Sequence, residues 1–213
     1  MTLQRMKWGF ARQFARPHGP LGQVAARIMR RGNAPLNLWI LELMELTPSS
    51  RVLEVGFGPG IALAELLHQM PEGFVAGIDT SASMANQARR RHGKAIASGQ
   101  LQIHCGDASS LPFEGQTFDW VLGTHVLYFW ADPVSTLLEL QRVLRPGGSL
   151  ALGFQERAHM PEMAVEGLSA AGAKLVDAGE VTELTRKSGF GSIRLETKRG
   201  VGGPAGFCVF ATK

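Results

Sequence analysis

The sequence predicts an α/β protein: a doubly wound, mainly parallel sheet of seven strands, with helices on both faces and a C-terminal antiparallel hairpin. Short apolar and β-branched runs alternate with segments of helical periodicity between residues 51 and 154, and such alternation implies right-handed βαβ crossovers. Two further extended runs are joined by a glycine-rich turn at 200–206, which predicts the hairpin. The predicted strands are 51–55, 74–79, 101–105, 118–124, 148–154, 191–198 and 206–212.

The helices are predicted from apolar residues that recur at intervals of three and four. Between Leu21 and Leu46 this periodicity is interrupted around Gly32 to Pro35, which predicts two helices ahead of the first strand. Ser81 is expected to cap a helix that follows the second strand. The later helical segments are 61–70, 81–92, 133–144 and 181–188.

Composition places the chain among globular proteins. Its 213 residues suit one domain, and 45% apolar with 19% charged residues excludes the composition of a disordered chain. No apolar run reaches the roughly 18 residues that span a bilayer, and the start lacks the pattern of a secretory signal. We therefore expect a cytoplasmic protein without a membrane span.

The two cysteines, Cys105 and Cys208, each lie in a short apolar run. Burial preference favours reduced, buried thiols over a disulfide or a metal site. We expect no bound metal.

Positive charge is concentrated at the start of the chain, where no acid precedes Glu42. This asymmetry suits an anionic substrate, nucleic acid or lipid headgroups, but a solvated helix face is the interpretation that we favour. A second basic cluster, 89–94, is also interpreted as a solvated helix surface. The basic residues before Glu42 are Arg5, Lys7, Arg12, Arg16, Arg27, Arg30 and Arg31.

A glycine-rich loop follows the first predicted strand, where residues 52–60 read V-L-E-V-G-F-G-P-G. Gly56, Gly58 and Gly60 allow a sharp turn into a helix whose free N–H groups face a ligand. A dinucleotide site requires G-x-G-x-x-G. Here Ile61 stands where the third glycine of that motif would be, and the spacing is G-x-G-x-G instead.

Acidic residues stand at or near the ends of three successive strands, at Glu54, Asp79 and Asp107. Asp79 lies 23 residues after Gly56 and is placed to accept hydrogen bonds from both hydroxyls of a ribose. The other role open to Asp79 is a structural one, as the cap of the next helix, but Ser81 can fill that role. Asp107 can accept a hydrogen bond from the exocyclic amine of an adenine, although a Gly-Asp pair alone indicates only a turn.

This arrangement resembles the class I S-adenosylmethionine-dependent methyltransferases over roughly residues 48–154, and is similar to the small-molecule enzymes grouped with ubiquinone and menaquinone biosynthesis. The resemblance implies a Rossmann-like fold with S-adenosyl-L-methionine as cofactor. It implies a single domain, with 1–46 as a lid, 47–154 as the cofactor-binding core, and 155–213 as a substrate-side segment and closing hairpin. The implied cofactor residues are Glu54, Gly56, Gly58, Gly60, Asp79, Thr80, Met84, Asp107, Ala108 and Thr124.

The reaction centre is expected at the end of the segment F-D-W-V-L-G-T-H, residues 118–125, which looks like motif IV of the family. A methyl donor of this kind needs chiefly an aligned acceptor, and a base only if the acceptor carries a proton. We name His125 and Tyr128 as the catalytic candidates. His18 and His159 are weaker candidates for the base. Two interpretations are open for four apolar residues, which either line a pocket or pack in the core: Phe129, Trp130, Met160 and Met163.

We therefore expect a methyltransferase that acts on a small-molecule acceptor by in-line displacement. Residues 118–125 are followed neither by the N/D-P-P-Y/F motif of amino-methylating enzymes nor by a Pro-Cys pair, which argues against nucleic-acid bases as acceptors. The alternatives are a nucleic-acid methyltransferase that uses the basic N-terminal arm and a non-catalytic protein that binds S-adenosylmethionine. Aminopropyl transfer is disfavoured, because the acids that would bind a polyamine are lacking after Thr124.

Overall fold

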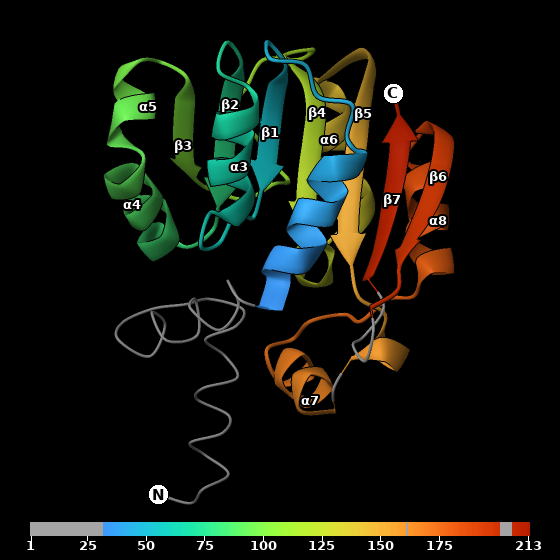
Figure 1. Cartoon of the computed structure of the whole chain (residues 1–213). Helices are drawn as coiled ribbons and strands as arrows, with labels where there is room; N and C mark the ends of the chain where they lie inside the picture. Colours follow the sequence, from blue (N-terminus) through green and yellow to red (C-terminus); the bar gives the residue numbers. More distant parts are fainter. Residues whose placement is uncertain (1–31, 161, 201–205) are drawn as a thin grey trace, which may run out of the picture.

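The computed structural model describes residues 32–160, 162–200 and 206–213, and its centre is one mixed sheet (Figure 1). The strands are β1 (Arg51–Val55), β2 (Phe74–Asp79), β3 (Leu101–Cys105), β4 (Phe118–Thr124), β5 (Leu144–Phe154), β6 (Gly191–Lys198) and β7 (Gly206–Thr212). Their order across the sheet is β3-β2-β1-β4-β5-β7-β6. Strands β1 to β5 run parallel, while β7 is antiparallel to both β5 and β6. The predicted fold class and hairpin are confirmed.

Helices cover both faces of this sheet. On one face lie a helix over residues 32–43, α3 (Ile61–Gln69) and α4 (Ala82–Arg91), and on the other α6 (Pro133–Val143) and α8 (Ala178–Lys187) (Figure 1). The described part of the chain also contains α5 (Gly93–Ala97), α7 (Glu162–Ala170) and the short 3-10 helices η1 (Leu127–Phe129) and η2 (Arg157–His159). No helix in the described ranges is long and apolar enough to cross a bilayer.

Two apolar cores result, because alternate residues of each strand face opposite sides. Leu53 and Val121 pack toward α6 and α8, whereas Val52 and Leu122 pack toward α3 and α4. The central strands are buried on both faces, as expected for parallel strands that lie between helices.

Three predictions about local structure are wrong. The interruption at 32–35 is not observed, because residues 32–43 form continuous helix. The buried face of that helix carries Leu36, Ile40 and Leu41, and its packing outweighs the poor helix propensity of glycine and proline. Strand β5 begins at Leu144, four residues earlier than the predicted 148.

Cys105 is the third correction, since it is exposed, whereas Cys208 is buried as predicted. Cys105 ends β3, an edge strand whose residues alternate between buried and exposed up to Ile103. An apolar run at a sheet edge is covered less completely than one at the centre. Both thiols are free, and no group of His, Cys, Asp and Glu in the described parts of the chain is arranged to hold a metal ion.

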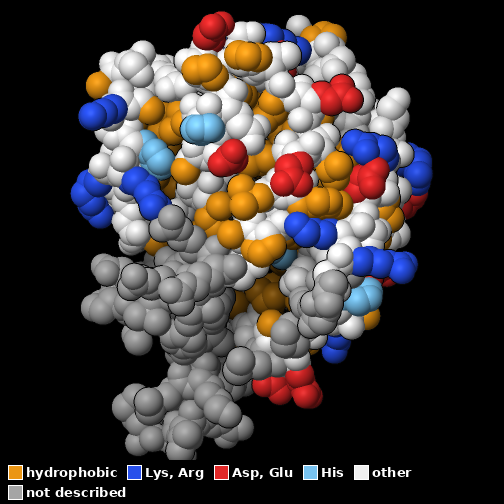
Figure 2. Space-filling model, in the orientation of Figure 1, with side chains coloured by type: hydrophobic (Ala, Val, Ile, Leu, Met, Phe, Trp, Pro, Cys, Tyr) orange, Lys and Arg blue, Asp and Glu red, His pale blue; other side chains and the backbone are white. Residues whose placement is uncertain are grey.

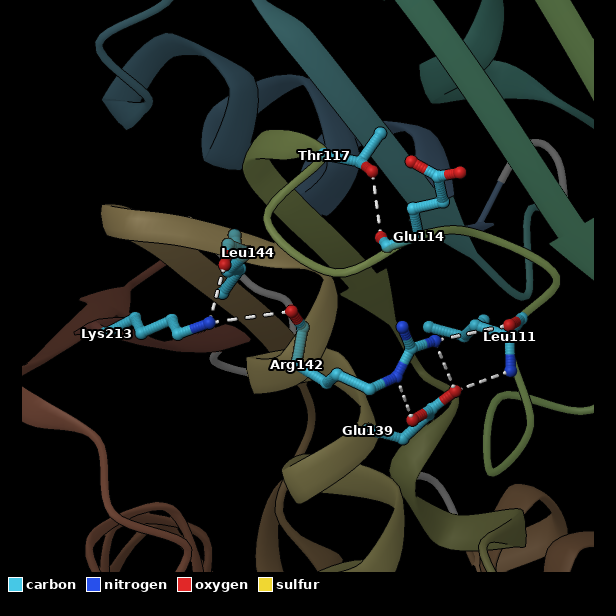
Figure 3. A network of polar contacts seen from close by, with 7 residues as sticks. All are labelled: Leu111, Glu114, Thr117, Glu139, Arg142, Leu144 and Lys213. Atoms are coloured by element: carbon cyan, nitrogen blue, oxygen red, sulfur yellow. Dashed lines mark hydrogen bonds and ion pairs between the residues drawn. The ribbon is translucent and has the colours of Figure 1, made fainter.

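Side-chain hydrogen bonds and an ion pair hold the long loop that connects β3 to β4 (Figure 3). Glu139 Oε1 accepts the N–H of Leu111 at 2.8 Å, and the Arg142 guanidinium donates to the carbonyl of the same residue at 3.3 Å. Glu139 and Arg142 also pair with each other at 2.7 Å. Lys213 donates to the Leu144 carbonyl at 2.7 Å, which ties the C-terminal residue to the start of β5.

Gly73 precedes β2 and packs against the backbone that leads into β1. A Cβ at this position would lie 2.5 Å from the Ser50 carbonyl oxygen. Gly73→Ala is therefore expected to destabilise the fold by about 1–3 kcal/mol, since the backbone must shift. Gly93→Ala is the matched control, because a Cβ at that helical position meets no atom within 4 Å. Urea unfolding of both variants measures the difference; equal stabilities would contradict the packing at Gly73.

Candidate functional site

The loops that follow the parallel strands meet at one edge of the sheet, and the first of them is the glycine loop, residues 56–60. Gly56, Gly58 and Gly60 have φ angles of +65°, +48° and +70°, a region that favours glycine. A Cβ at Gly56 would clash with Val126 Cγ1, which lies on the loop after β4. A Cβ at Gly58 would meet no atom of the described residues within 4 Å, so these residues leave open space beside the middle glycine.

Asp79 links the glycine loop to the end of β2. Its Oδ2 accepts the N–H of Gly58 at 2.8 Å, and its Oδ1 accepts the N–H of Ser81, also at 2.8 Å. The side chain of Ser81 caps α4 by accepting from Met84 N, as predicted. Burial raises the pKa of Asp79, and the two backbone hydrogen bonds oppose that rise.

Glu54 lies in β1, beside this edge, and is 4% exposed. Its Oε2 has no hydrogen-bond partner among the residues that the structure describes. Burial, and secondly the charge of Asp79, raise the pKa of Glu54 well above its usual value, while a hydrogen bond from the Leu63 backbone opposes the rise. A buried carboxyl oxygen without a hydrogen bond is costly, so a ligand that brings a hydrogen-bond donor or a positive charge to Oε2 would be stabilised here.

The end of β3 presents the third acid, Asp107. Its Oδ1 accepts the N–H of Ser109 at 2.9 Å and the hydroxyl of the same residue at 2.8 Å. Asp107 is exposed and Ala108 is buried. Of the other two predicted cofactor residues on this side, Thr80 is exposed, and Met84 is buried in the core beside α3.

The end of β4 carries Thr124 and His125. Thr124 Oγ1 is buried and has no hydrogen-bond partner in the described ranges of the chain. His125 has a φ of +59°, and its N–H donates to the Gly153 carbonyl at 2.8 Å. Burial lowers the pKa of the His125 imidazole to about 4, so the ring is neutral at physiological pH.

Tyr128 lies beside His125, with 3.4 Å between the phenol oxygen and His125 Nδ1, and the two rings are stacked. The Tyr128 hydroxyl donates to the Gln155 carbonyl at 2.8 Å and accepts the Gln155 N–H at 2.6 Å. Burial raises the pKa of Tyr128. The phenol is therefore protonated, and it fastens the loop after β5 next to the imidazole.

The other predicted residues are distributed around this edge. Trp130 is 9% exposed and Phe129 39% exposed, while Met160 packs partly buried against the core. His159 Nδ1 lies 3.2 Å from Glu156 Oε2, next to the Phe207 ring. His18 and the side chain of Met163 lie outside the described residues.

Two residues with unusual surroundings were missed by the sequence analysis. Val126 occupies the space that a side chain at Gly56 would need. Asn37 is 7% exposed and its Oδ1 is buried without a partner, while its amide nitrogen donates to the Asn33 carbonyl. Neither residue belongs to a motif, so only the packing of helix 32–43 and of the loop after β4 reveals them.

Comparison with known proteins agrees with this geometry. Residues 53–152 match the family described as "Methyltransferase domain". The uncharacterized methyltransferase YdaC of Bacillus subtilis is 29% identical over 63% of this chain and 72% of its own length. A demethylmenaquinone methyltransferase of Bacillus cereus is 34% identical over 52% of this chain and 46% of its own length.

Solved structures share the fold. A SAM-dependent methyltransferase from Aquifex aeolicus has a TM-score of 0.67 at 22% identity, covering 84% of this chain and 92% of its own. The Haemonchus contortus phosphoethanolamine N-methyltransferase 2, solved with S-adenosyl-L-methionine, has a TM-score of 0.68 at 20% identity, covering 83% and 51%. The chain spans only 32% to 46% of the length of several curated relatives that it matches.

The fold thus places the chain in the class of doubly wound α/β proteins that carry a glycine loop and acidic residues at the carboxyl edge of a mainly parallel sheet. More specifically, residues 53–152 match a methyltransferase domain, and the chain is similar to proteins that include a demethylmenaquinone methyltransferase, in agreement with the predicted resemblance to S-adenosylmethionine-dependent methyltransferases.

The lowered pKa of His125 has a consequence for stability. The imidazole has a pKa of about 4 in the folded chain and 6.5 without the protein environment, so the unfolded state binds more protons between these values. Stability is therefore lost as pH falls from 6.5 toward 4. In His125→Asn this loss is expected to be smaller, and asparagine tolerates the positive φ.

Urea unfolding at neutral pH and at about pH 5 measures this effect. The matched control is the same substitution at an exposed position, His68→Asn. If the free energy of unfolding of His125→Asn changed with pH as much as that of the parent chain, His125 would not be a neutral imidazole in the folded state.

Proposed function

We propose that this chain transfers a methyl group from S-adenosylmethionine to a small-molecule acceptor. The observation that supports this proposal best is the buried pair Glu54 and Asp79 beside an open glycine loop. Glu54 Oε2 has no partner and Gly58 leaves free space, which suits the ammonium and sulfonium charges of the cofactor. The demethylmenaquinone methyltransferase among the relatives acts on a small molecule, as its name states.

The cofactor residues are proposed from this geometry and from the family motifs. Glu54, with the backbone of Gly56, Gly58 and Gly60, would hold the methionine part of the cofactor. Asp79 would accept hydrogen bonds from the ribose hydroxyls, through the lone pairs that its bonds to Gly58 and Ser81 leave free. Thr80 and Met84 would flank the ribose. Asp107 and Ala108 would bind the adenine, and Thr124 would border the methyl group.

When bound, the cofactor supplies a sulfonium-activated methyl group. The chain's part is then to orient the acceptor in line with that methyl and to exclude water. His125 is a neutral imidazole and can take a proton from the acceptor. Tyr128, whose hydroxyl is held by the Gln155 backbone, is proposed to position His125 rather than to act as the base.

The domain limits and the location are also proposals. Residues 47–154 form the cofactor-binding core, 1–46 contribute a lid, and α7 with the segment up to 178 shapes the acceptor side. We propose a cytoplasmic enzyme. A nucleic-acid methyltransferase that uses the basic residues before Glu42, and a non-catalytic protein that binds S-adenosylmethionine, are the competing functions.

Asp79→Ala tests the cofactor site. It removes the acceptor of two backbone N–H groups and the proposed clamp on the ribose, so the affinity for S-adenosylhomocysteine should fall by about 10-fold to 100-fold. Isothermal titration calorimetry measures the affinity. Glu72→Gln removes an exposed acid and serves as the control. Unchanged binding by Asp79→Ala would remove Asp79 from the cofactor site.

The acceptor is tested by incubating the protein and radiolabelled S-adenosylmethionine with cell extract divided into small molecules and macromolecules. Asp79→Ala is the inactive control. Label in the small-molecule fraction is expected, and mass spectrometry then identifies the product. Label in macromolecules alone would contradict the proposal in favour of nucleic-acid methylation, which should also weaken steeply with salt. No label, despite intact cofactor binding, would indicate a non-catalytic protein.

A further inference from the structure

A surface cavity of about 400 Å³ lies between the glycine loop and the C-terminal half of α4. Cavities of a few hundred Å³ hold small organic ligands. The cofactor residues proposed on α4 do not extend beyond Met84, so the α4 wall of this cavity is used by none of the roles assigned above. The lining residues are Gly58, Pro59, Gly60, Gln87, Ala88, Arg90, Arg91 and His92.

The charge of this cavity is positive and uncompensated. Arg90 and Arg91 are exposed and form no ion pair or side-chain hydrogen bond with any part of the chain that the structure describes. The neighbouring Arg89 differs, because it donates to Asn86 Oδ1 at 3.1 Å and to the Ile103 carbonyl at 2.9 Å. No aspartate or glutamate is among the lining residues. Figure 2 shows basic and histidine side chains together over α4 and α5, at the left of this face.

His92 adds a polar atom without a partner. It follows α4 as the C-cap, and its backbone N–H donates to the Ala88 carbonyl at 2.9 Å. Its Nε2 is buried and has no hydrogen bond with any described residue. Burial, and secondly the charge of Arg91, lower the pKa of His92. A neutral imidazole keeps one N–H, which an anion can accept once the ring turns toward the cavity.

The glycine loop forms the opposite wall. Its Gly58 N–H is already bonded to Asp79 at 2.8 Å, and a Cβ at Gly58 would meet no atom within 4 Å. The hydrogen-bond donors for an anion must therefore come from α4, while the loop provides space. A ligand held here would touch the same loop that lies beside Glu54 and Asp79.

We propose that this cavity binds a small anion that carries a phosphate group, with Arg90 and Arg91 as its principal ligands and His92 as a further donor. Guanidinium groups match phosphate oxygens in pairs, which makes arginine well suited to this recognition. The sequence pattern alone favours a solvated face for these cations. Their position around a cavity, next to an unpartnered imidazole and without an acid, is what distinguishes a binding site from such a face.

Calorimetric titration with inorganic pyrophosphate, at constant ionic strength and without cofactor, tests the site. The double variant Arg90→Gln/Arg91→Gln should bind pyrophosphate about tenfold more weakly or worse, because charged hydrogen bonds are lost. Arg157→Gln/Arg199→Gln removes two charges from exposed positions elsewhere and should bind like the parent chain. Binding of S-adenosylhomocysteine by the Arg90/Arg91 variant checks that the fold is intact.

The same titration in saturating S-adenosylhomocysteine separates this cavity from the cofactor site. Retained pyrophosphate binding is expected, with an affinity equal to or tighter than in the free protein, since a stabilised loop favours both ligands. Abolished binding would place the anion in the cofactor site and overturn the proposal. Equal weakening in both double variants, or no pyrophosphate binding by the parent chain, would also overturn it.

Discussion

The carboxylate of Asp79 is the interaction on which the arrangement of the site depends. It accepts N–H groups from Gly58 and Ser81, and so joins the loop after β1, the end of β2 and the start of α4. Charge buried at this edge is costly, and Glu54 adds a second carboxyl whose pKa burial raises. The fold tolerates this cost because β1 and β2, which carry the two carboxyls, lie in a sheet that helices cover on both faces. A cationic ligand would compensate the charge, and this is the physical reason that the site suits S-adenosylmethionine.

The register of the sheet brings the functional loops together. Glu54 pairs with Gly77 on one side and with Leu122 on the other, and a Cβ at Gly77 would lie 2.9 Å from the Phe57 ring. That glycine therefore makes room for the loop that carries Gly56 to Gly60. The loop after β4 closes the edge, with Val126 packed against Gly56 and His125 bonded to Gly153 of β5. Rigid strands thus place side chains that are far apart in sequence around one space.

The sequence was sufficient for features that local chemistry determines. Strand runs such as Phe74–Asp79, the Ser81 cap and the hairpin follow from apolar pattern and turn residues, and the structure has them at the predicted places. Other features depend on tertiary packing. The helix at 32–43 passes through Pro35 because its apolar face is buried, and Cys105 is exposed because β3 is an edge strand. The hydrogen bonds of Tyr128 to Gln155 could not be foreseen, since they join segments 27 residues apart.

The number of protons released or taken up on cofactor binding tests the central claim, that the buried Glu54 carboxyl interacts with a cationic cofactor. Calorimetric titration with S-adenosylmethionine at mildly acidic pH, in buffers of different ionisation enthalpy, counts the protons. Because burial raises the pKa of Glu54 and a nearby positive charge lowers it again, binding should release protons, and Glu54→Gln should abolish the release. Proton uptake on binding, or the same release from Glu54→Gln, would contradict the account.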